Sequence, residues 1–324
     1  MATSRSWRPA TVLEGPFAAR LDQIDELNQV FSESFTERYR RDGMVGVRVP
    51  FLNPAVWRYA IRDAADGAMI WRGDRDEIVG FNIVHRSGVE GWMGPIAVRS
   101  ENQGVGAGKE IVRKGVEWLK VHGASVIGLE TMPRTMDNIG FYSALGFVPG
   151  KLTLTMTVDA SYGDKPASLF GRLSPGDKDD ALRECLELVS SLQPGYDHTR
   201  EIALTDELSL GDTLLLYKKE RLVGFALCHT APLVEGRARE DLRVLKLALD
   251  DLSHLDEMIR LLSDVARRSG TRRVSIRVQT EYKSAYQRLI ALRARIRWSD
   301  LRMSFAGCAE RRAERGLVLS NWEI

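Results

Sequence analysis

The chain has 324 residues, of which 44% are hydrophobic and 28% are charged, and its formal net charge at pH 7 is +2. This length and composition predict two soluble globular domains, and the small net charge gives no general case for a nucleic-acid partner. No apolar run has membrane-spanning length and the N-terminal residues lack a secretory core, so we expect neither a membrane anchor nor export.

The first clear elements are two strands and a helix. The stretch Ile78–His85 predicts a strand, and the short apolar run Pro95–Val98 predicts a second, buried one. A segment with three glycines in five positions follows at Gln103–Lys109. It opens an amphipathic helix that ends at Gly123. The apolar residues of this helix recur at helical spacing, at Ile111, Val112, Val116 and Leu119.

The glycine-rich segment has the composition of an anion cradle. Glycines at 104, 106 and 108 let backbone N–H groups approach an anion, and the helix adds its positive dipole end. A P-loop is excluded, because Gln103 stands at its first glycine and Glu110 follows the lysine. A dinucleotide fingerprint lacks its third glycine, although Glu130 is placed as a ribose-binding acid, and a turn without ligand is the other alternative.

Further along the chain the pattern is strand, helix, strand. Ser125–Glu130 predicts a strand, Asn138–Gly146 a short helix with a glycine stop, and Leu152–Val158 an alternating strand. The segments Gln103–Gly108 and Phe141–Phe147 lie about 35 residues apart. Together they resemble the two signature segments of the GCN5-related N-acetyltransferase (GNAT) family, Gln/Arg-x-x-Gly-x-Gly/Ala and Tyr-x-x-x-Gly-Phe.

The resemblance implies an α/β fold, with a mixed, mostly antiparallel twisted sheet flanked by helices. It also implies acetyl-CoA as cosubstrate, with its pantetheine arm on the strand and its pyrophosphate on the loop. Tyr142 would lie near the thioester sulfur and act as general acid for the thiolate. The residues that the resemblance assigns to the coenzyme are Ile96, Ala97, Val98, Gln103, Gly104, Val105, Gly106, Ala107, Gly108, Lys109, Asn138 and Tyr142.

Two positions depart from the family pattern. Many relatives have an asparagine seven residues before the tyrosine, where this chain has Thr135, and Asn138 lies one helical turn from the tyrosine. Many relatives also have a glutamate base near the place of Trp92. The candidates for the base are Glu90, Glu130 and His85. We assign Glu130, at the end of a strand beside the loop, although the pattern alone also fits solvated glutamates and a structural histidine.

The chain contains an internal repeat. Leu222–His229 repeats Ile78–His85 at an offset of 144 residues, and Arg273–Val278 takes the place of the strand at Ser125. This pattern indicates the duplication of a whole domain rather than a solenoid. We expect domains at residues 1–160 and 165–310 and a C-terminal tail at 311–324, with the boundary in the polar stretch Asp159–Ala167.

The second copy lacks the glycine-rich cradle. In its place stand four carboxylates, Asp250, Asp251, Asp256 and Glu257, and Ser253 with Asp256 forms a capping-box pattern. Such a helix end satisfies its own N–H groups and repels a pyrophosphate. We therefore expect a degenerate second domain and one coenzyme per chain.

The predicted function is N-acyl transfer, from acetyl-CoA to a primary amine of a small molecule or peptide, catalysed by the first domain. The alternative is an acyl-CoA-binding sensor or scaffold without turnover. We expect no metal, nucleic acid or membrane partner, and the three widely spaced cysteines fit a reduced cytoplasm. Trp57, Trp71 and Trp92 either line the acceptor site or belong to the core. The acceptor and the oligomeric state are not readable from the sequence.

Overall fold

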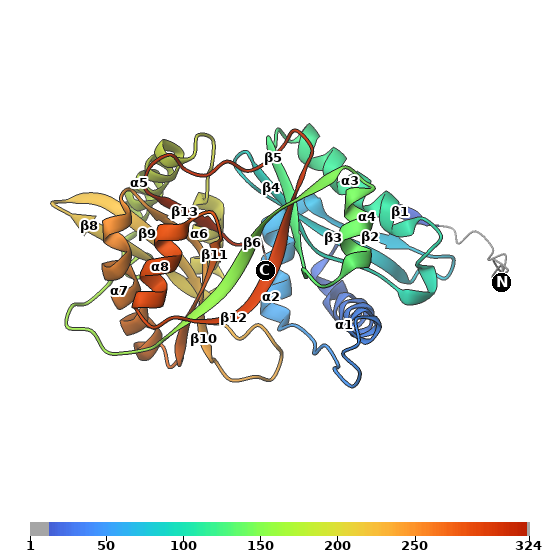
Figure 1. The fold of residues 1–324 in the computed structure, drawn as a ribbon, viewed down its shortest axis with the longest axis horizontal. Helices are drawn as coiled ribbons and strands as arrows, with labels where there is room; N and C mark the ends of the chain where they lie inside the picture. Colours follow the sequence, from blue (N-terminus) through green and yellow to red (C-terminus); the bar gives the residue numbers. More distant parts are fainter. Residues whose placement is uncertain (1–12, 323–324) are drawn as a thin grey trace.

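The computed structural model describes residues 13–322, and its elements form two successive runs in the same order (Figure 1). The first run is β1 (Glu14–Ala18), α1 (Ile24–Arg41), α2 (Pro54–Ala64), β2 (Ala68–Arg72), β3 (Ile78–Ser87), β4 (Glu90–Val98), α3 (Ala107–Val121), β5 (Val126–Thr131), α4 (Met136–Ser143) and β6 (Phe147–Asp159). The second is β7 (Ser168–Leu169), α5 (Pro175–Leu192), α6 (Thr199–Glu207), β8 (Gly211–Lys218), β9 (Arg221–His229), β10 (Asp241–Leu249), α7 (Leu255–Arg268), β11 (Arg273–Gln279), α8 (Lys283–Ala291) and β12 (Arg295–Phe305).

This order confirms the duplication predicted from the repeat. The predicted strands become β3, the last part of β4, β5 and β6. The helix after the glycines becomes α3, and the short helix before Gly146 becomes α4. A last strand, β13 (Leu317–Ser320), has no counterpart in the first run. It lies within the segment expected to be a tail.

Local chemistry explains where the helices begin and how closely they pack. Asn53 caps α2, because its side chain accepts a hydrogen bond from the Ala55 N–H and Pro54 follows at the first helical position. In α3 an added Cβ at Gly115 would lie 2.5 Å from the Asn82 amide and 2.6 Å from the Met93 sulfur. The helix can therefore lie close to β3 and β4 only because this residue is glycine.

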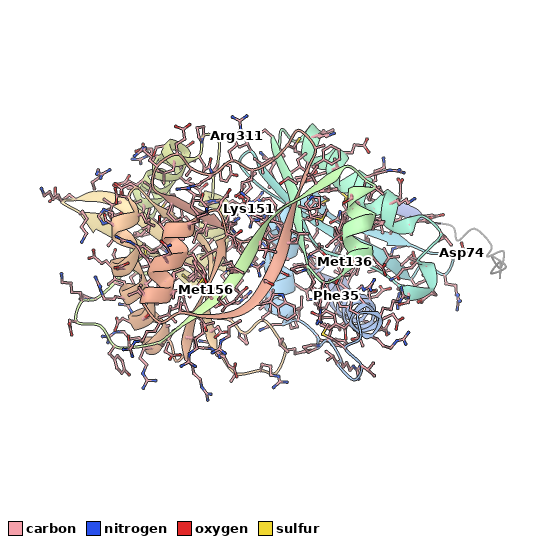
Figure 2. The ribbon with its side chains drawn as sticks, in the orientation of Figure 1. Phe35, Asp74, Met136, Lys151, Met156 and Arg311 are labelled. Carbon is pink, nitrogen blue, oxygen red and sulfur yellow. The ribbon has the colours of Figure 1, made fainter. Side chains whose placement is uncertain are left out.

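The strands of residues 13–322 form one 13-stranded sheet that runs through both halves (Figure 1). Along the sheet the order is β1-β2-β3-β4-β5-β12-β6-β11-β10-β9-β8-β7, and β13 pairs with β10. The last strand of each half has thus crossed to the other: β12 pairs with β5, and β6 pairs with β11. In Figure 2, β6 crosses the middle of the molecule, and the labels of Lys151 and Met156 mark its course. Neither half completes its sheet without the other.

A row of buried charges crosses the exchanged strands. Glu130 on β5 accepts hydrogen bonds from Arg302 on β12 at 2.9 Å and from Arg277 on β11 at 2.5 Å. Arg277 also binds Asp300 on β12 at 3.0 Å. These four side chains are at most 7% exposed. Because a buried charge needs a partner, the row fixes which strands lie side by side.

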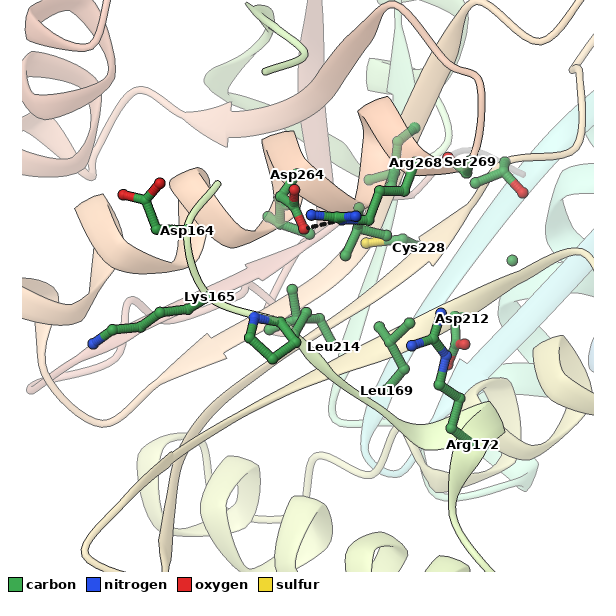
Figure 3. A pocket seen from close by; sticks show the side chains of 17 residues that line it. Asp164, Lys165, Leu169, Arg172, Asp212, Leu214, Cys228, Asp264, Arg268 and Ser269 are labelled. Atoms are coloured by element: carbon green, nitrogen blue, oxygen red, sulfur yellow. Dashed lines mark hydrogen bonds and ion pairs between the residues drawn. The ribbon is translucent and has the colours of Figure 1, made fainter. Parts of the chain in front are cut away.

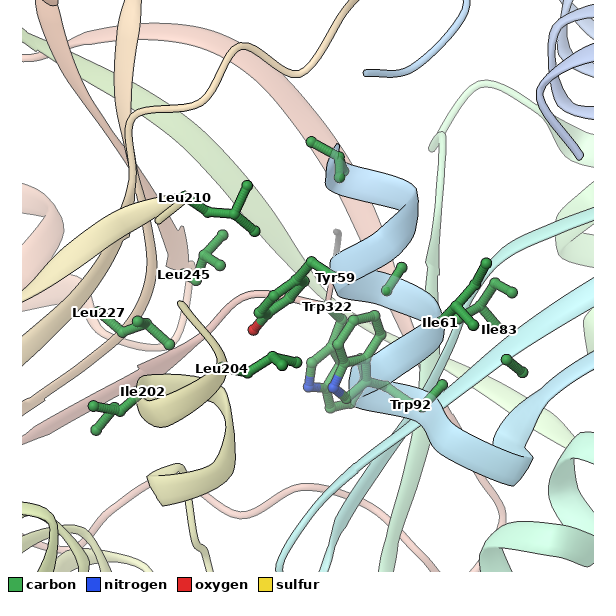
Figure 4. Close-up of a cluster of buried hydrophobic side chains, with 14 of the residues drawn as sticks. Tyr59, Ile61, Ile83, Trp92, Ile202, Leu204, Leu210, Leu227, Leu245 and Trp322 are labelled. Atoms are coloured by element: carbon green, nitrogen blue, oxygen red, sulfur yellow. The ribbon is translucent and has the colours of Figure 1, made fainter. Parts of the chain in front are cut away.

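Two layers of helices cover the sheet. Helices α3 and α7 each pack over a core of their own half, whereas α1, α2, α5 and α6 share one core that spans both halves. Figure 4 shows that shared core, with Tyr59 and Trp92 of the first half facing Leu204 of the second, and Trp322 beside them. Trp57, Trp71 and Trp92 are all buried core residues, at 0%, 1% and 4% exposure. They are therefore not exposed at a surface site.

The charge row predicts a specific pH dependence of stability. Burial by itself would raise the pKa of Glu130, but the Arg277 and Arg302 guanidinium groups lower it from 4.5 to about 2. A depressed carboxyl pKa stabilises the fold above the unfolded-state value, and that stability is lost as the pH falls toward the folded-state value. We expect Glu130→Gln to cost about 3 kcal/mol near neutral pH, and the cost to shrink between pH 4.5 and 2. Urea unfolding of both proteins across that range measures it.

The control is Glu117→Gln, which removes an exposed ion pair to Lys114 with the Glu117 side chain 62% exposed. That variant should unfold at the wild-type urea concentration at every pH. A Glu130→Gln protein with wild-type stability at pH 7 would contradict the role of the charge row.

Candidate functional site

The candidate site lies where β4 and β5 part. The two parallel strands pair from Glu90 with Val126 to Met93 with Leu129. Beyond that point, β4 continues to Val98 and stays paired with β3 on one side. On its other side, no strand of residues 13–322 pairs with it. We call Gly94–Val98 the free edge of β4. Of the predicted residues, Ile96 and Val98 direct backbone groups to this open side, whereas Ala97 bonds to Phe81 on β3. The Val98 carbonyl already accepts from side chains, so the N–H groups of Ile96 and Val98 and the Ile96 carbonyl are the groups left for a ligand.

The loop after the free edge offers a run of backbone donors. Gly104 and Gly106 have φ of +83° and +101°, and nothing lies within 4 Å of a Cβ added at either position. Within the described chain, the N–H groups of the five residues Gly104–Gly108 have no hydrogen-bond partner. Helix α3 begins here, and its N-cap residue Gly106 has no side-chain cap. Unpartnered N–H groups at a helix N-terminus form an anion-binding site.

The Gln103 side chain holds the loop against the free edge. Its Nε2 donates to the Val98 carbonyl at 2.8 Å, and its Oε1 accepts from Arg41 on α1 at 2.9 Å. The Ser34 hydroxyl donates to the same Val98 carbonyl at 3.1 Å. The side chain of Gln103 therefore positions the loop, and a ligand would meet the loop through its backbone. Lys109 lies exposed at the start of α3.

Two cavities stand out in the described chain. One of about 260 Å³ lies against the loop and is lined by Leu13, Val79, Asn102, Val105, Gly106, Ala107 and Glu110. A larger one of about 500 Å³ lies in the second half between residues 164–169, β8 and α7 (Figure 3). Two of its three aspartates are already engaged, Asp264 by Arg268 and Asp212 by the N–H groups of Gly171 and Thr213. Volume alone therefore does not make it the functional site.

Tyr142 lies on α4, next to the loop. It belongs to the same apolar cluster as Ile96 and Val98, and its ring centre is 5.2 Å from that of Phe141. An added Cβ at Gly108 would lie 3.3 Å from Phe141, so α4 packs on the first turn of α3. Burial raises the pKa of Tyr142 to about 12. The phenol therefore keeps its proton at neutral pH and can donate it in a hydrogen bond.

The first departure from the family pattern, Thr135 in place of an asparagine, lies at the start of this helix, and Asn138 lies on it. Thr135, at the N-cap of α4, is fully buried and its hydroxyl donates to Asp42 at 2.8 Å. Asn138 approaches the Thr131 hydroxyl at 3.4 Å. Thr135 thus ties α4 to the end of α1, and its hydroxyl proton is not available to a ligand.

The structure argues against Glu130 as a base. Its carboxylate accepts from Thr153, Arg302 and Arg277, and its pKa of about 2 leaves it a very weak base. Glu90 is equally occupied: it is fully buried and accepts from the Ser320 hydroxyl at 2.7 Å and the Trp322 indole at 2.8 Å. The expectation that both glutamates are solvated is wrong, because each is buried among donors from the second half.

His85 is buried beside the shared core. Its Nδ1 lies 2.5 Å from an Asp63 oxygen, and its ring stacks on Trp92 with centres 3.9 Å apart. Its Nε2 has no partner within the described residues. Asp63, Ser320 and Trp322 were missed by the sequence analysis. Their partners are far away in the chain, so no local pattern marked them.

The second half lacks the open loop. The Asp251 side chain accepts from the Ser253 N–H at 2.7 Å, in a 3₁₀ turn (Leu252–His254) that precedes α7. The cap is thus Asp251, and not the Ser253 and Asp256 pair that the sequence suggested, because the turn moves the start of α7 to Leu255. Within residues 13–322 no cluster of His, Cys, Asp or Glu could hold a metal ion. None of the helices there is long and apolar enough to cross a membrane.

Comparison with known proteins agrees with this arrangement. Residues 24–147 match the acetyltransferase (GNAT) family, and the match contains both the free edge and the loop. Residues 24–147 are thus similar to the GNAT family. The uncharacterized N-acetyltransferase YobR of Bacillus subtilis is 29% identical over 76 residues, which are 24% of this chain and 31% of YobR. The alignment thus spans about a third of that relative.

Solved structures show the fold of the whole chain. A protein from Pyrococcus horikoshii aligns over 99% of this chain and 98% of its own, with a TM-score of 0.67 and 15% identity. A tandem GNAT protein from the clavulanic acid biosynthesis pathway aligns over 93% of this chain and all of its own, with a TM-score of 0.60 and 12% identity. The chain therefore has the fold of these proteins, and its two halves follow the duplication that the repeat predicted.

Proposed function

We propose that this protein is a GNAT-type N-acyltransferase that moves an acetyl group from acetyl-CoA to a primary amine, and that the first half carries the reaction. The observation that carries the proposal is the run of five unpartnered N–H groups, Gly104–Gly108, at the end of the free edge of β4. Only the first half has this combination among the described residues. The family match to residues 24–147 also supports the first half as the part of the chain that carries the reaction.

Different residues of the site would bind different parts of the coenzyme. In the segment Ile96, Ala97 and Val98, the backbone groups that face the open side, the N–H and carbonyl of Ile96 and the N–H of Val98, would pair with the amides of the pantetheine arm. The N–H groups of Gly104–Gly108, with the dipole of α3, would hold the pyrophosphate, and the nearby cation of Lys109 adds attraction. Asn138 lies on α4 near the same ligand. The open space around Gly104 and Gly106 fits a phosphate at this place.

Tyr142 stabilises the leaving group in this proposal. When the amine nitrogen bonds to the acyl carbon, the carbon–sulfur bond breaks and the sulfur carries the electron pair away. A protonated phenol in an apolar cluster donates a hydrogen bond, and finally a proton, to that sulfur. The proton that the amine nitrogen loses as the amide forms then replaces the one that the phenol gave up. The elevated pKa of Tyr142 keeps the proton in place until negative charge develops.

The proposal does not use Glu130 or Glu90 as a base, since both carboxylates are saturated by donors. The acceptor is a small-molecule or peptide amine, in agreement with the N-acetyltransferase relatives. The cytoplasm remains the predicted location, and the three cysteines are unpaired within the described chain.

A sensor that binds acyl-CoA without turnover is the alternative, since neither glutamate is free to act. The decisive experiment incubates the protein with acetyl-CoA and a panel of amines and titrates the free thiol. Release that depends on the amine supports the enzyme. Saturable binding of coenzyme with no release from any amine supports the sensor.

Gly106→Asp should abolish coenzyme binding. The substitution places a carboxylate among the N–H groups, where phosphate oxygens would lie. Gly123→Asp is a matched control: Gly123 also has a positive φ, of +81°, and open space around it, but it follows the opposite end of α3. Isothermal titration calorimetry with coenzyme A should detect binding to the control only. Equal affinity in two folded variants would refute the loop assignment.

Tyr142→Phe should keep the ring and lose the proton. We expect turnover to fall by roughly 10²–10⁴-fold while the affinity for coenzyme A is retained. Tyr162→Phe, on an exposed tyrosine (67%) in the segment between the halves, should turn over like wild type. Thiol release under saturating acetyl-CoA measures both variants. Wild-type turnover in Tyr142→Phe would leave that residue only a packing role.

A further inference from the structure

Strands β4 and β10 occupy the same place in the two halves. Against their antiparallel neighbours, Gly80 pairs with Val98 in the first half and Gly224 pairs with Leu249 in the second. The register of both strand pairs shifts at the equivalent position, next to the pair Val84 and Met93 in the first half and next to the pair Cys228 and Val244 in the second. Residues Lys246–Leu249 are thus the counterparts of Pro95–Val98.

In the second half too, two parallel strands pair only over their first residues and then part. Strand β10 pairs with β11 only from Asp241 with Arg273 to Arg243 with Ser275. Beyond that point, the edge of β10 that corresponds to the free edge of β4 is not free. Strand β13 pairs with it in antiparallel register, from Lys246 with Ser320 to Leu249 with Leu317. The opposite edge of β10 is taken by β9.

The partner strand is firmly anchored. The Lys246 amine donates to the Ser320 hydroxyl at 2.7 Å, and the Asn321 N–H donates to the Leu245 carbonyl at 2.9 Å. On the other side, the Gln279 side chain on β11 donates to the Ser320 carbonyl at 3.4 Å. Leu317, Val318 and Leu319 are at most 3% exposed. The segment therefore fills the space between β10 and β11 with main chain and apolar side chains.

We propose that β13 is the resident occupant of the second half's coenzyme-binding edge, so that the chain binds a single coenzyme. The assignment of that edge rests on the proposed function, in which the pantetheine arm pairs with Ile96–Val98. In the second half a peptide backbone takes the same hydrogen-bonding edge, as in β-strand addition. The acidic start of α7, preceded by the 3₁₀ turn that Asp251 caps, is then a second obstacle, and not the only reason why coenzyme is excluded.

The same segment continues into the first half. The Trp322 indole donates to Glu90 at 2.8 Å, and the Ser320 hydroxyl donates to the other oxygen of that carboxylate at 2.7 Å. The Trp322 ring packs directly on Gly128: a Cβ added at that glycine would lie only 2.3 Å from the Trp322 Cζ3 atom. The Arg302 guanidinium lies over the same ring, 3.8 Å from its centre. Displacing β13 would therefore also remove the hydrogen-bond donors of the buried Glu90 carboxylate. The free-energy cost of leaving that charge without donors holds β13 in place.

Hydrogen–deuterium exchange on the full-length protein, with and without coenzyme A, tests the proposal. Without coenzyme, the amides of residues 246–249 should exchange slowly, and the free-edge amides of Ile96 and Val98 much faster. Saturating coenzyme A should slow exchange in residues 96–98 and leave residues 246–249 unchanged. Calorimetry on the same sample should give one site per chain.

Each other outcome is decisive. Fast exchange of residues 246–249 without coenzyme, their further protection by coenzyme A, or two sites per chain would each overturn the proposal. If coenzyme A protects neither segment while residues 246–249 stay slow, the proposed function fails and the closure of the second edge by β13 stands.

A pair of variants tests the anchoring of β13. Ser320→Ala removes the hydroxyl that joins Lys246 to Glu90 and should speed exchange of residues 246–249 about tenfold. Ser161→Ala, at an exposed residue between the halves, should leave that exchange unchanged. Equal exchange in the two variants would contradict the anchoring.

Discussion

Glu130, Arg302, Asp300 and Arg277 are buried together on three strands that meet only because β6 and β12 exchange places between the halves. An unpaired charge at any of these positions would cost several kcal/mol, so the pairing of each strand depends on the others. The helices on one face share a core across both halves. The two copies are therefore one structural unit, and the first half reaches its native sheet only with a strand from the second.

The duplication leaves two equivalent strand edges with different partners. On β4 the edge from Gly94 to Val98 is open and ends in a loop of unpartnered N–H groups. On β10 the equivalent edge is paired with β13, and Asp251 caps the 3₁₀ turn that precedes the following helix. The open edge suits a coenzyme and the closed edge serves stability. Through Trp322 and Glu90, the segment that closes one edge also supports the strand that carries the other.

Much of this fold could be predicted from the sequence, because its signals are local. The three glycines, the helix after them and the repeat at Leu222 each lie within a short window. The exchange of β6 and β12 leaves no such signal, since each strand has the same apolar pattern whichever sheet it joins. The candidate base failed for the same reason: Arg277 and Arg302, more than 140 residues from Glu130, decide its protonation. Trp322 lay in a segment expected to be a tail.

The central claim is that the two halves form a single cooperative unit, and differential scanning calorimetry of the full-length protein tests it most directly. The account predicts one transition, with equal calorimetric and van't Hoff enthalpies, that moves as a whole to higher temperature when coenzyme A is added. Two resolved transitions, of which coenzyme A shifts only one, would contradict it.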